Sequence, residues 1–274
     1  MAGSFYPRNP GELRREIESC FLHKLGPGKL PGGPSPERKT VAVVCPHAGY
    51  VYSGPVAAHA YFRLAQEPAP DVVVIIGPSH QAWSSPIAMM DKGEWETPLG
   101  RVKIDEKLAE KIFKASGLID IDEDAHRSEH SIEVQLPFLQ YIYGSGFKFI
   151  PICMGIQDLE LSRKLGADLG TGLKDVNAVL IASSDLSHYV PQATAAELDK
   201  LVINAALSLN EEKLQSYVLS EGITMCGYGP VSTILVASKI LGAREGELLS
   251  YKTSGDITGD YSAVVGYSAI AISR

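Results

Sequence analysis

Four short runs of branched apolar residues mark the middle of the chain, near residues 40–45, 71–77, 147–152 and 176–182. Each run is too short and too continuously apolar for an amphipathic helix, and has the pattern of a strand that is buried on both faces. Segments with apolar residues at helical spacing lie before, between and after these runs. The alternation predicts an α/β fold with a largely parallel central sheet joined by right-handed crossovers.

The helical segments and the last strands complete the predicted order of elements. Helices are expected over residues 10–25, 55–66, 105–116, 131–144, 158–173, 194–209, 210–219 and 229–242, and strands over 247–254 and 262–273. Pro55 stands at a favoured first helical position, and Ser131 is a candidate helix cap. The chain has no internal repeat and no change of composition, so residues 1–274 are predicted to form a single domain.

Histidines follow three of the predicted strands. His47 comes after the first run, His80 after the second and His188 after the fourth. An open parallel sheet binds its ligands in the crevice outside the carboxyl ends of its strands. One such histidine would more often be structural, but three on one edge predict a functional site there.

Asp185 and His188 are candidate catalytic residues. They are three positions apart and could share one face of a helical turn, where a carboxylate can orient an imidazole for proton transfer. The alternative is that Asp185 caps a short helix.

Cys226 and His130 are two further candidates, each with a structural alternative. Cys226 precedes a glycine-rich turn and a helix start, where a thiol is expected to ionise readily and to act as a nucleophile or a metal ligand, although a lone buried cysteine is usually inert. His130 and Glu133 either reach the same crevice, as supporting groups or ligand contacts, or belong to the start of the helix that follows. His126 is expected to be solvated.

Composition excludes several classes of function. The net charge is -7, from 25 basic and 32 acidic residues without a basic block, so nucleic acid is an unexpected partner. No apolar run approaches the roughly 18 residues of a membrane span, and the N-terminus lacks a signal sequence, so we expect a soluble cytoplasmic protein. The four cysteines form no CxxC pair, and Cys45 and Cys153 lie in apolar runs typical of a core.

Six motifs in this order carry a resemblance to the Memo family: AGSFYP, PHAGYVYSG, GPSH, SEHSIEVQLPFL, SSDLSHY and CGYGP. The resemblance implies a fold similar to class III extradiol (LigB-like) non-haem iron dioxygenases, with a metal at the strand ends. It places the family's metal ligands on His47, His80 and Cys226, and it places His188 at the position of the dioxygenase catalytic histidine. Tyr50 and Tyr228, within two of the motifs, are expected to contact a ligand.

The resemblance also implies a function. A thiolate replaces the carboxylate of the ring-cleaving enzymes, which favours iron or copper and allows zinc. We therefore expect a metal-binding protein, an iron- or copper-dependent oxidoreductase. The alternatives are a non-enzymatic module that binds a peptide or small anion, and a hydrolase that uses Cys226 or zinc. Its expected partners are a small molecule or peptide and, from the resemblance, AMMECR-type and radical SAM proteins.

Overall fold

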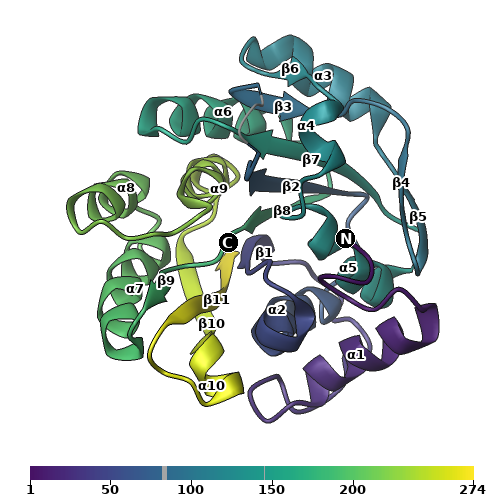
Figure 1. The fold of residues 1–274 in the computed structure, drawn as a ribbon. Coiled ribbons are helices and arrows are strands. Elements are labelled where there is room, and N and C mark those ends of the chain that lie inside the picture. The colour runs from purple at the N-terminus through teal and green to yellow at the C-terminus, as the bar shows by residue number, and fades with distance from the viewer. Residues whose placement is uncertain (82–84, 145) are drawn as a thin grey trace.

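The computed structural model describes residues 1–81, 85–144 and 146–274 and is an α/β sandwich with helices on both faces of a mixed sheet (Figure 1). Four parallel strands form the centre of the sheet, in the order β1 (Thr40–Cys45), β8 (Ala178–Ser183), β2 (Val72–Pro78) and β7 (Lys148–Met154). They coincide with the four apolar runs, and nearly all of their residues are buried. The predicted α/β fold with a largely parallel central sheet is confirmed.

The outer strands depart from the parallel pattern. Within the described ranges the sheet has nine strands, in the order β10-β11-β1-β8-β2-β7-β3-β6, with β9 paired to β11. β11 is antiparallel to its three neighbours, and β3 is antiparallel to β7. These outer strands are β10 (Glu245–Thr253), β11 (Val264–Ser273), β3 (Ile87–Met89), β6 (Asp120–Ile121) and β9 (His188–Val190), and a separate hairpin joins β4 (Glu94–Thr97) to β5 (Gly100–Lys103).

Helices cover the sheet on both sides, as Figure 1 shows. On one side lie α1 (Pro10–Leu22), α2 (Tyr50–Ala65) and α5 (Leu136–Tyr143), and on the other α6 (Leu159–Gly172), α7 (Gln192–Leu207), α8 (Glu211–Ser220) and α9 (Tyr228–Ile240). α3 (Glu106–Ser116) packs against α6. Three short helices are α4 (Asp124–Arg127), the 3-10 turn η1 (Glu133–Gln135) and α10 (Ser254–Thr258). Among the helices of the described residues, none has the length and apolar character needed to cross a bilayer.

Two predicted helix starts are wrong. α2 begins at Tyr50 and not at Pro55, which lies inside the helix, because Tyr50 is buried and Ser53 closes the first turn by donating to the Ala48 carbonyl. The predicted helix 131–144 is broken into η1 and α5. Ser131 does not cap it; its buried hydroxyl donates to the carbonyl of Pro78 at the end of β2.

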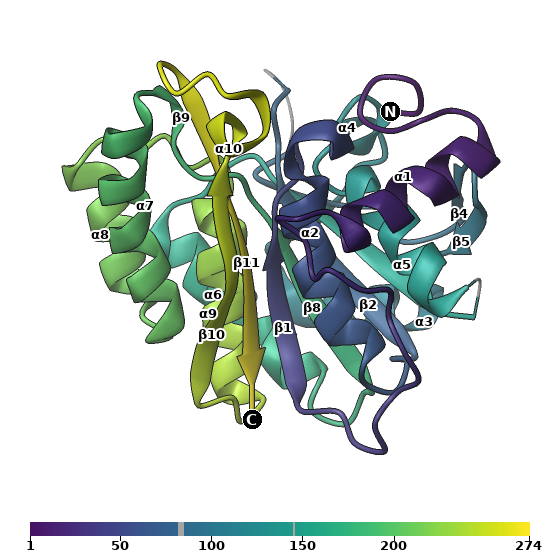
Figure 2. The same ribbon diagram turned by 90° about the horizontal axis from the view of Figure 1, so that it is seen from below.

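The carboxyl ends of the four central strands meet at one edge of the sheet, because the strands are parallel. β11 runs the other way, so its first residues reach this edge, and in Figure 2 β9, α10 and the N-terminal segment lie toward the same end. The residues that follow the central strands are therefore brought together at this edge.

Candidate functional site

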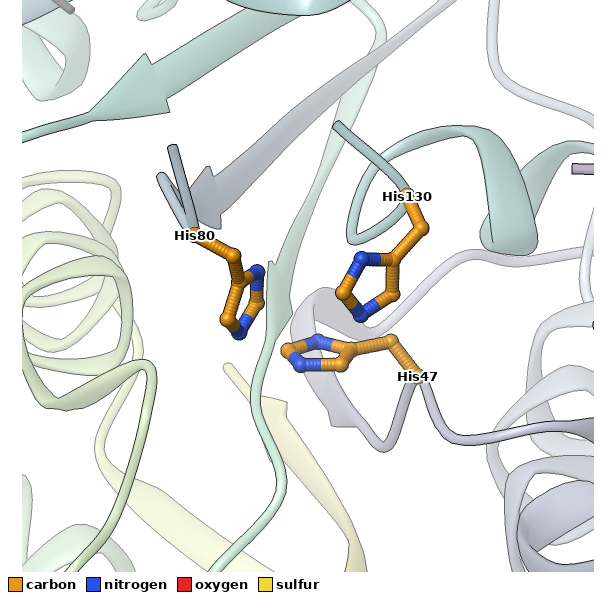
Figure 3. Close-up of side chains that lie close together, drawn as sticks. All are labelled: His47, His80 and His130. Atoms are coloured by element: carbon orange, nitrogen blue, oxygen red, sulfur yellow. The ribbon is translucent and has the colours of Figure 1, made fainter. Parts of the chain in front are cut away.

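Three histidines converge at the carboxyl edge of the sheet (Figure 3). His47 follows β1, His80 follows β2, and His130 lies in the segment between α4 and η1. Each offers one ring nitrogen, and these three nitrogens all lie within 4.8 Å of one another. Imidazole nitrogens grouped in this way could hold a metal ion. The structure thus brings together His47 and His80, as the sequence predicted, and gives the third place to His130.

The tautomer of His47 is fixed by a buried hydroxyl. Ser183 Oγ donates its single proton to the carbonyl of Ser131 at 2.6 Å, because a carbonyl can only accept. It must therefore accept from His47 Nδ1, which lies 2.8 Å away, and from Gln135 Nε2, also at 2.8 Å. The proton of the neutral His47 ring is on Nδ1, so Nε2 keeps the lone pair that a metal requires.

Gln135 is held in turn by a buried tyrosine. Its amide nitrogen also donates to the carbonyl of Pro46, and its amide oxygen accepts from the hydroxyl of Tyr61. Burial and the neighbouring histidines His130 and His80 lower the pKa of His47 well below its usual value. His47 is therefore neutral near pH 7. The Ser183 hydroxyl, which is itself held by Gln135, fixes the orientation of its ring.

His80 is oriented by Glu129. Nδ1 of His80 lies 2.9 Å from a carboxylate oxygen of Glu129, and the same carboxylate accepts from the backbone amides of His80 and Ser131. Burial alone would raise the pKa of Glu129, but these hydrogen bonds outweigh it and lower the pKa to about 2. The ionised carboxylate makes Nδ1 of His80 the donor and leaves Nε2 free, which is the usual support of a metal-binding histidine.

His130 is held by stacking. Its ring lies between Phe5, at 4.4 Å between ring centroids, and His80, at 4.5 Å. Burial lowers its pKa to about 4, with the Glu129 carboxylate acting in the opposite direction. Gly77 makes this arrangement possible, because a Cβ there would lie 2.4 Å from Ser131 Oγ, just beyond His130 in the chain. His130 therefore joins the group as a neutral ring.

Cys226 reaches the group only through His47. Its Sγ lies 3.3 Å from His47 Nε2, but within the described residues His47, His80 and Cys226 do not form a set as close as the three histidines. Burial, and then the Asp185 carboxyl, raise the pKa of the thiol, so the predicted ready ionisation at the start of α9 is wrong for the protein without a metal. Helix-terminal stabilisation is outweighed by the loss of water.

Asp185 has a different partner from the one predicted. Residues 184–187 are not helical, and the Asp185 carboxylate accepts from the backbone amide of His47 at 2.9 Å, with its other oxygen 3.9 Å from His47 Nε2. It neither caps a helix nor orients His188. Burial raises its pKa to about 6. Asp185 therefore fixes the turn that carries His47.

His188 begins strand β9, three residues after Asp185. Its Nδ1 lies 2.8 Å from the carbonyl of Thr224, and the Thr224 hydroxyl accepts from its backbone amide. Because the carbonyl can only accept, Nδ1 carries the proton of the neutral ring and Nε2 is unprotonated. His188 can thus accept a proton at Nε2.

Three predicted ligand contacts have other places. Tyr50 is buried and its hydroxyl donates to the Val134 carbonyl, so it is a core residue and the prediction is wrong. Glu133 accepts from the ammonium of Met1 and the hydroxyl of Tyr6, which fastens the N-terminal segment that carries Phe5. Tyr228 lines a cavity to which none of the three histidines contributes.

The sequence analysis missed Glu129, Ser183 and Gln135, although all three lie within the quoted motifs. The available signal was a polar residue in the same motif as a candidate site residue, as Glu129 and Gln135 are with His130 and Ser183 is with Asp185. His126 was misplaced: it is 6% exposed, packs against Trp95, and neither ring nitrogen has a hydrogen-bond partner among the described residues. Burial lowers its pKa to about 4.

Comparison with known proteins gives consistent matches over the whole chain. A family model described as Memo-like protein matches residues 1–271. A MEMO1 family protein of Methanopyrus kandleri is 49% identical over 277 residues, which cover 100% of this chain and 98% of the relative. One from Methanothermobacter thermautotrophicus is 46% identical over 273 residues, covering 99% and 98%.

A solved structure supports the fold. The crystal structure of an uncharacterized protein from Escherichia coli K12 superposes with a TM-score of 0.60 and covers 85% of this chain and 99% of its own. The two sequences are 16% identical, so this likeness concerns the fold alone.

Proposed function

This chain belongs to the Memo-like family, and from that premise we propose that it is a redox protein that binds one iron or copper ion at the carboxyl edge of its sheet. The ion is held by His47, His80 and His130, with Cys226 as the adjoining thiolate. Bound iron or copper would supply a redox-active, Lewis-acidic centre for a small-molecule substrate.

The histidine group is the observation that carries this proposal. Its three donor nitrogens lie within 4.8 Å of one another, and the rings of His47 and His80 are held in the tautomer that leaves Nε2 unprotonated. A buried acceptor or carboxylate behind each ring is the support that metal-binding histidines require. The two supported rings follow β1 and β2, the strands on either side of β8.

Cys226 is placed to join the same ion as His47. Metal–nitrogen bonds of about 2.0–2.1 Å and a metal–sulfur bond of about 2.3 Å put the two ligand atoms about 3.1–3.6 Å apart for ordinary angles. The observed separation of 3.3 Å falls within that range. A sulfur donor beside imidazoles favours iron, copper(I) or zinc over harder ions.

His188 is proposed as the acid/base of the reaction. The Thr224 carbonyl fixes its proton on Nδ1 and leaves Nε2 as the acceptor. The sequence predicted that Asp185 would orient His188. We propose instead that the Thr224 carbonyl orients His188, whereas the Asp185 carboxylate binds the backbone amide of His47.

The test is metal content and oxygen uptake after anaerobic reconstitution with ferrous iron or copper(I). We expect about one ion per chain in the wild type, none in His47→Ala, and full loading in the matched control His59→Ala, whose half-buried ring lies on α2 and contacts the Leu25 carbonyl. Cys226→Ser should weaken binding, because a neutral hydroxyl replaces a soft thiolate, and Cys226→Asp should partly restore iron.

His188→Ala separates binding from reactivity. It should keep the ion and lose most of the oxygen uptake measured with ascorbate as reductant. Loss of the ion in His188→Ala would place this histidine among the ligands. Zinc as the only metal in the protein purified without chelator would overturn the redox proposal in favour of a hydrolase, and a wild type that takes up no metal would favour a binding module.

A further inference from the structure

A cavity opens beside the turn that carries Cys226. Its volume is about 530 Å³, and it lies between the loop after β7, helix α8 and the first turn of α9. Ile156 and Leu219 stand at its mouth with 48% and 75% of their surfaces exposed, and Tyr228 forms part of its wall. Cavities of a few hundred Å³ with mainly apolar walls are typical of small-molecule sites.

Gln215 gives this cavity a polar floor. The residue is 3% exposed, and its amide nitrogen lies 3.1 Å from the Gln157 carbonyl oxygen and 3.2 Å from the hydroxyl oxygens of Ser162 and Ser232, which share its two protons. Among the described residues, the hydrogen bonds of the Gln215 side chain are all made by this nitrogen. An amide oxygen on a cavity wall, with lone pairs available, is suited to a hydrogen-bond donor on a ligand.

The charges around the cavity select the sign of the ligand. Asp158 and Glu212 contribute carboxylates, and the described residues that line the cavity include no Lys or Arg. Glu212 is exposed and is partly balanced by Arg163 at 2.7 Å. The Tyr228 ring adds a face on which a cation can rest. The carboxylates would repel an anionic ligand. An aromatic or alkyl amine would place its apolar group against the apolar walls and its ammonium near the Gln215 oxygen and the carboxylates.

Gln157 connects the cavity to Cys226. It lines the cavity, and its carboxamide donates to the Cys226 carbonyl at 2.9 Å and accepts from the Gly229 amide at 2.8 Å. Gly229 must be glycine, because a Cβ there would lie 2.7 Å from Gln157 Cβ. A ligand that moves Gln157 or Tyr228 therefore moves the turn that presents Cys226.

We propose that this cavity is a binding site for a small amine with an apolar or aromatic group, and that its occupancy is linked through Gln157 to metal binding beside Cys226. The binding site stands independently of the histidine group, whereas the link rests on the proposed function. By reciprocity, the amine and the ion must change each other's affinity by the same factor.

The cavity is tested first on the metal-free protein, by protein-observed NMR titration with tryptamine and with indole-3-acetate, which carries the same ring and the opposite charge. Tryptamine should bind at least tenfold more tightly. Ser216→Trp, which fills the cavity, should weaken tryptamine at least tenfold, while Ser220→Trp, one turn further along exposed α8, should not. Equal affinity for both probes, no tryptamine binding, or unchanged binding in Ser216→Trp would overturn the site.

The link is tested by the dissociation constant of ferrous iron with and without saturating tryptamine. We expect a change of at least threefold in the wild type and none in Gln157→Leu, which keeps the cavity wall and removes both hydrogen bonds to the Cys226 turn. A change that persists in Gln157→Leu would show direct coordination of the amine and refute the link. If iron binds with an affinity that tryptamine does not change, only the link is refuted. If the protein binds no iron, the link and the proposed function are both refuted. In either case, the tryptamine titration of the metal-free protein still tests whether the cavity is a binding site.

Discussion

Ser183→Ala removes the hydroxyl on which the orientation of His47 depends. Ser183 Oγ donates to the Ser131 carbonyl and accepts from His47 Nδ1 and Gln135 Nε2, in a fully buried place at the end of β8. Gln135 keeps its bond to the Pro46 carbonyl, but His47 Nδ1 and the Ser131 carbonyl lose this partner. At about 1–3 kcal/mol for each buried group left unpaired, two such groups correspond to a loss of about 2–6 kcal/mol of unfolding free energy.

The His47 ring can relieve part of this penalty by moving its proton from Nδ1 to Nε2. That tautomer places the proton on the nitrogen that faces the metal position and Cys226 Sγ, so it must be reversed before a metal can bind. Loss of such support behind a ligand typically weakens metal affinity about 10–100-fold. We therefore expect Ser183→Ala to lower both the stability of the metal-free protein and its affinity for ferrous iron.

Ser162→Ala is the matched control, because Ser162 is equally buried but lies on α6 and accepts from Gln215. It should lose stability while its iron affinity stays within about threefold of the wild type. Unfolding free energies come from urea titrations of the metal-free proteins, and dissociation constants from anaerobic competition with a chelator. Iron affinity in Ser183→Ala equal to that in Ser162→Ala would refute the tautomer argument.

Two further predictions concern buried groups outside the histidine group. His126 has a pKa of about 4 in the folded protein and 6.5 in the unfolded chain, so the unfolded chain binds more protons between these two pH values. The unfolding free energy is therefore highest above pH 6.5 and falls by about 3 kcal/mol as the pH drops to 4. In urea titrations, His126→Gln should show a correspondingly shallower decline with pH. Asp199→Ala should cost about 2–4 kcal/mol of unfolding free energy, because the Ser187 amide and hydroxyl and the Tyr251 hydroxyl lose their buried acceptor, whereas Asp199→Asn should recover part of the loss; equal urea midpoints for all three proteins would contradict this.

The parallel core and its functional edge could be predicted from local pattern, because continuous branched apolar runs have few other stable arrangements. His47 and His80 were placed correctly for the same reason, since each follows directly from a central strand. The partners of these residues could not be predicted in this way. Asp185 lies three positions from His188 in sequence, yet it binds the amide of His47, 138 positions away. Adjacent parallel strands decide this contact, and sequence spacing does not report it.

His130 was missed as a third donor because its position depends on an irregular segment. The sequence pattern predicts a helix that starts at Ser131, which would have set the orientation of His130 at its N-terminus. In the structure, Ser131 instead donates to the Pro78 carbonyl at the end of β2, and the helical residues start at Glu133. The stacking of Phe5 on His130 comes from the N-terminal segment, more than a hundred residues away. Only the assembled sheet edge brings these parts together.

The burial of the donors decides the side from which a substrate can approach the proposed ion. The side chains of His47 and Asp185 are 2% and 6% exposed, whereas those of His80 and His130 are 33% and 20% exposed. Cys226 is half-buried, and its sulfur lies against the His47 ring and the backbone amide of Asp185. The side of the histidine group that faces solvent is therefore the side of His80 and His130, whose rings are the more exposed. A small molecule would approach a bound ion from this side, with the His47 ring and the Asp185 carboxyl behind it.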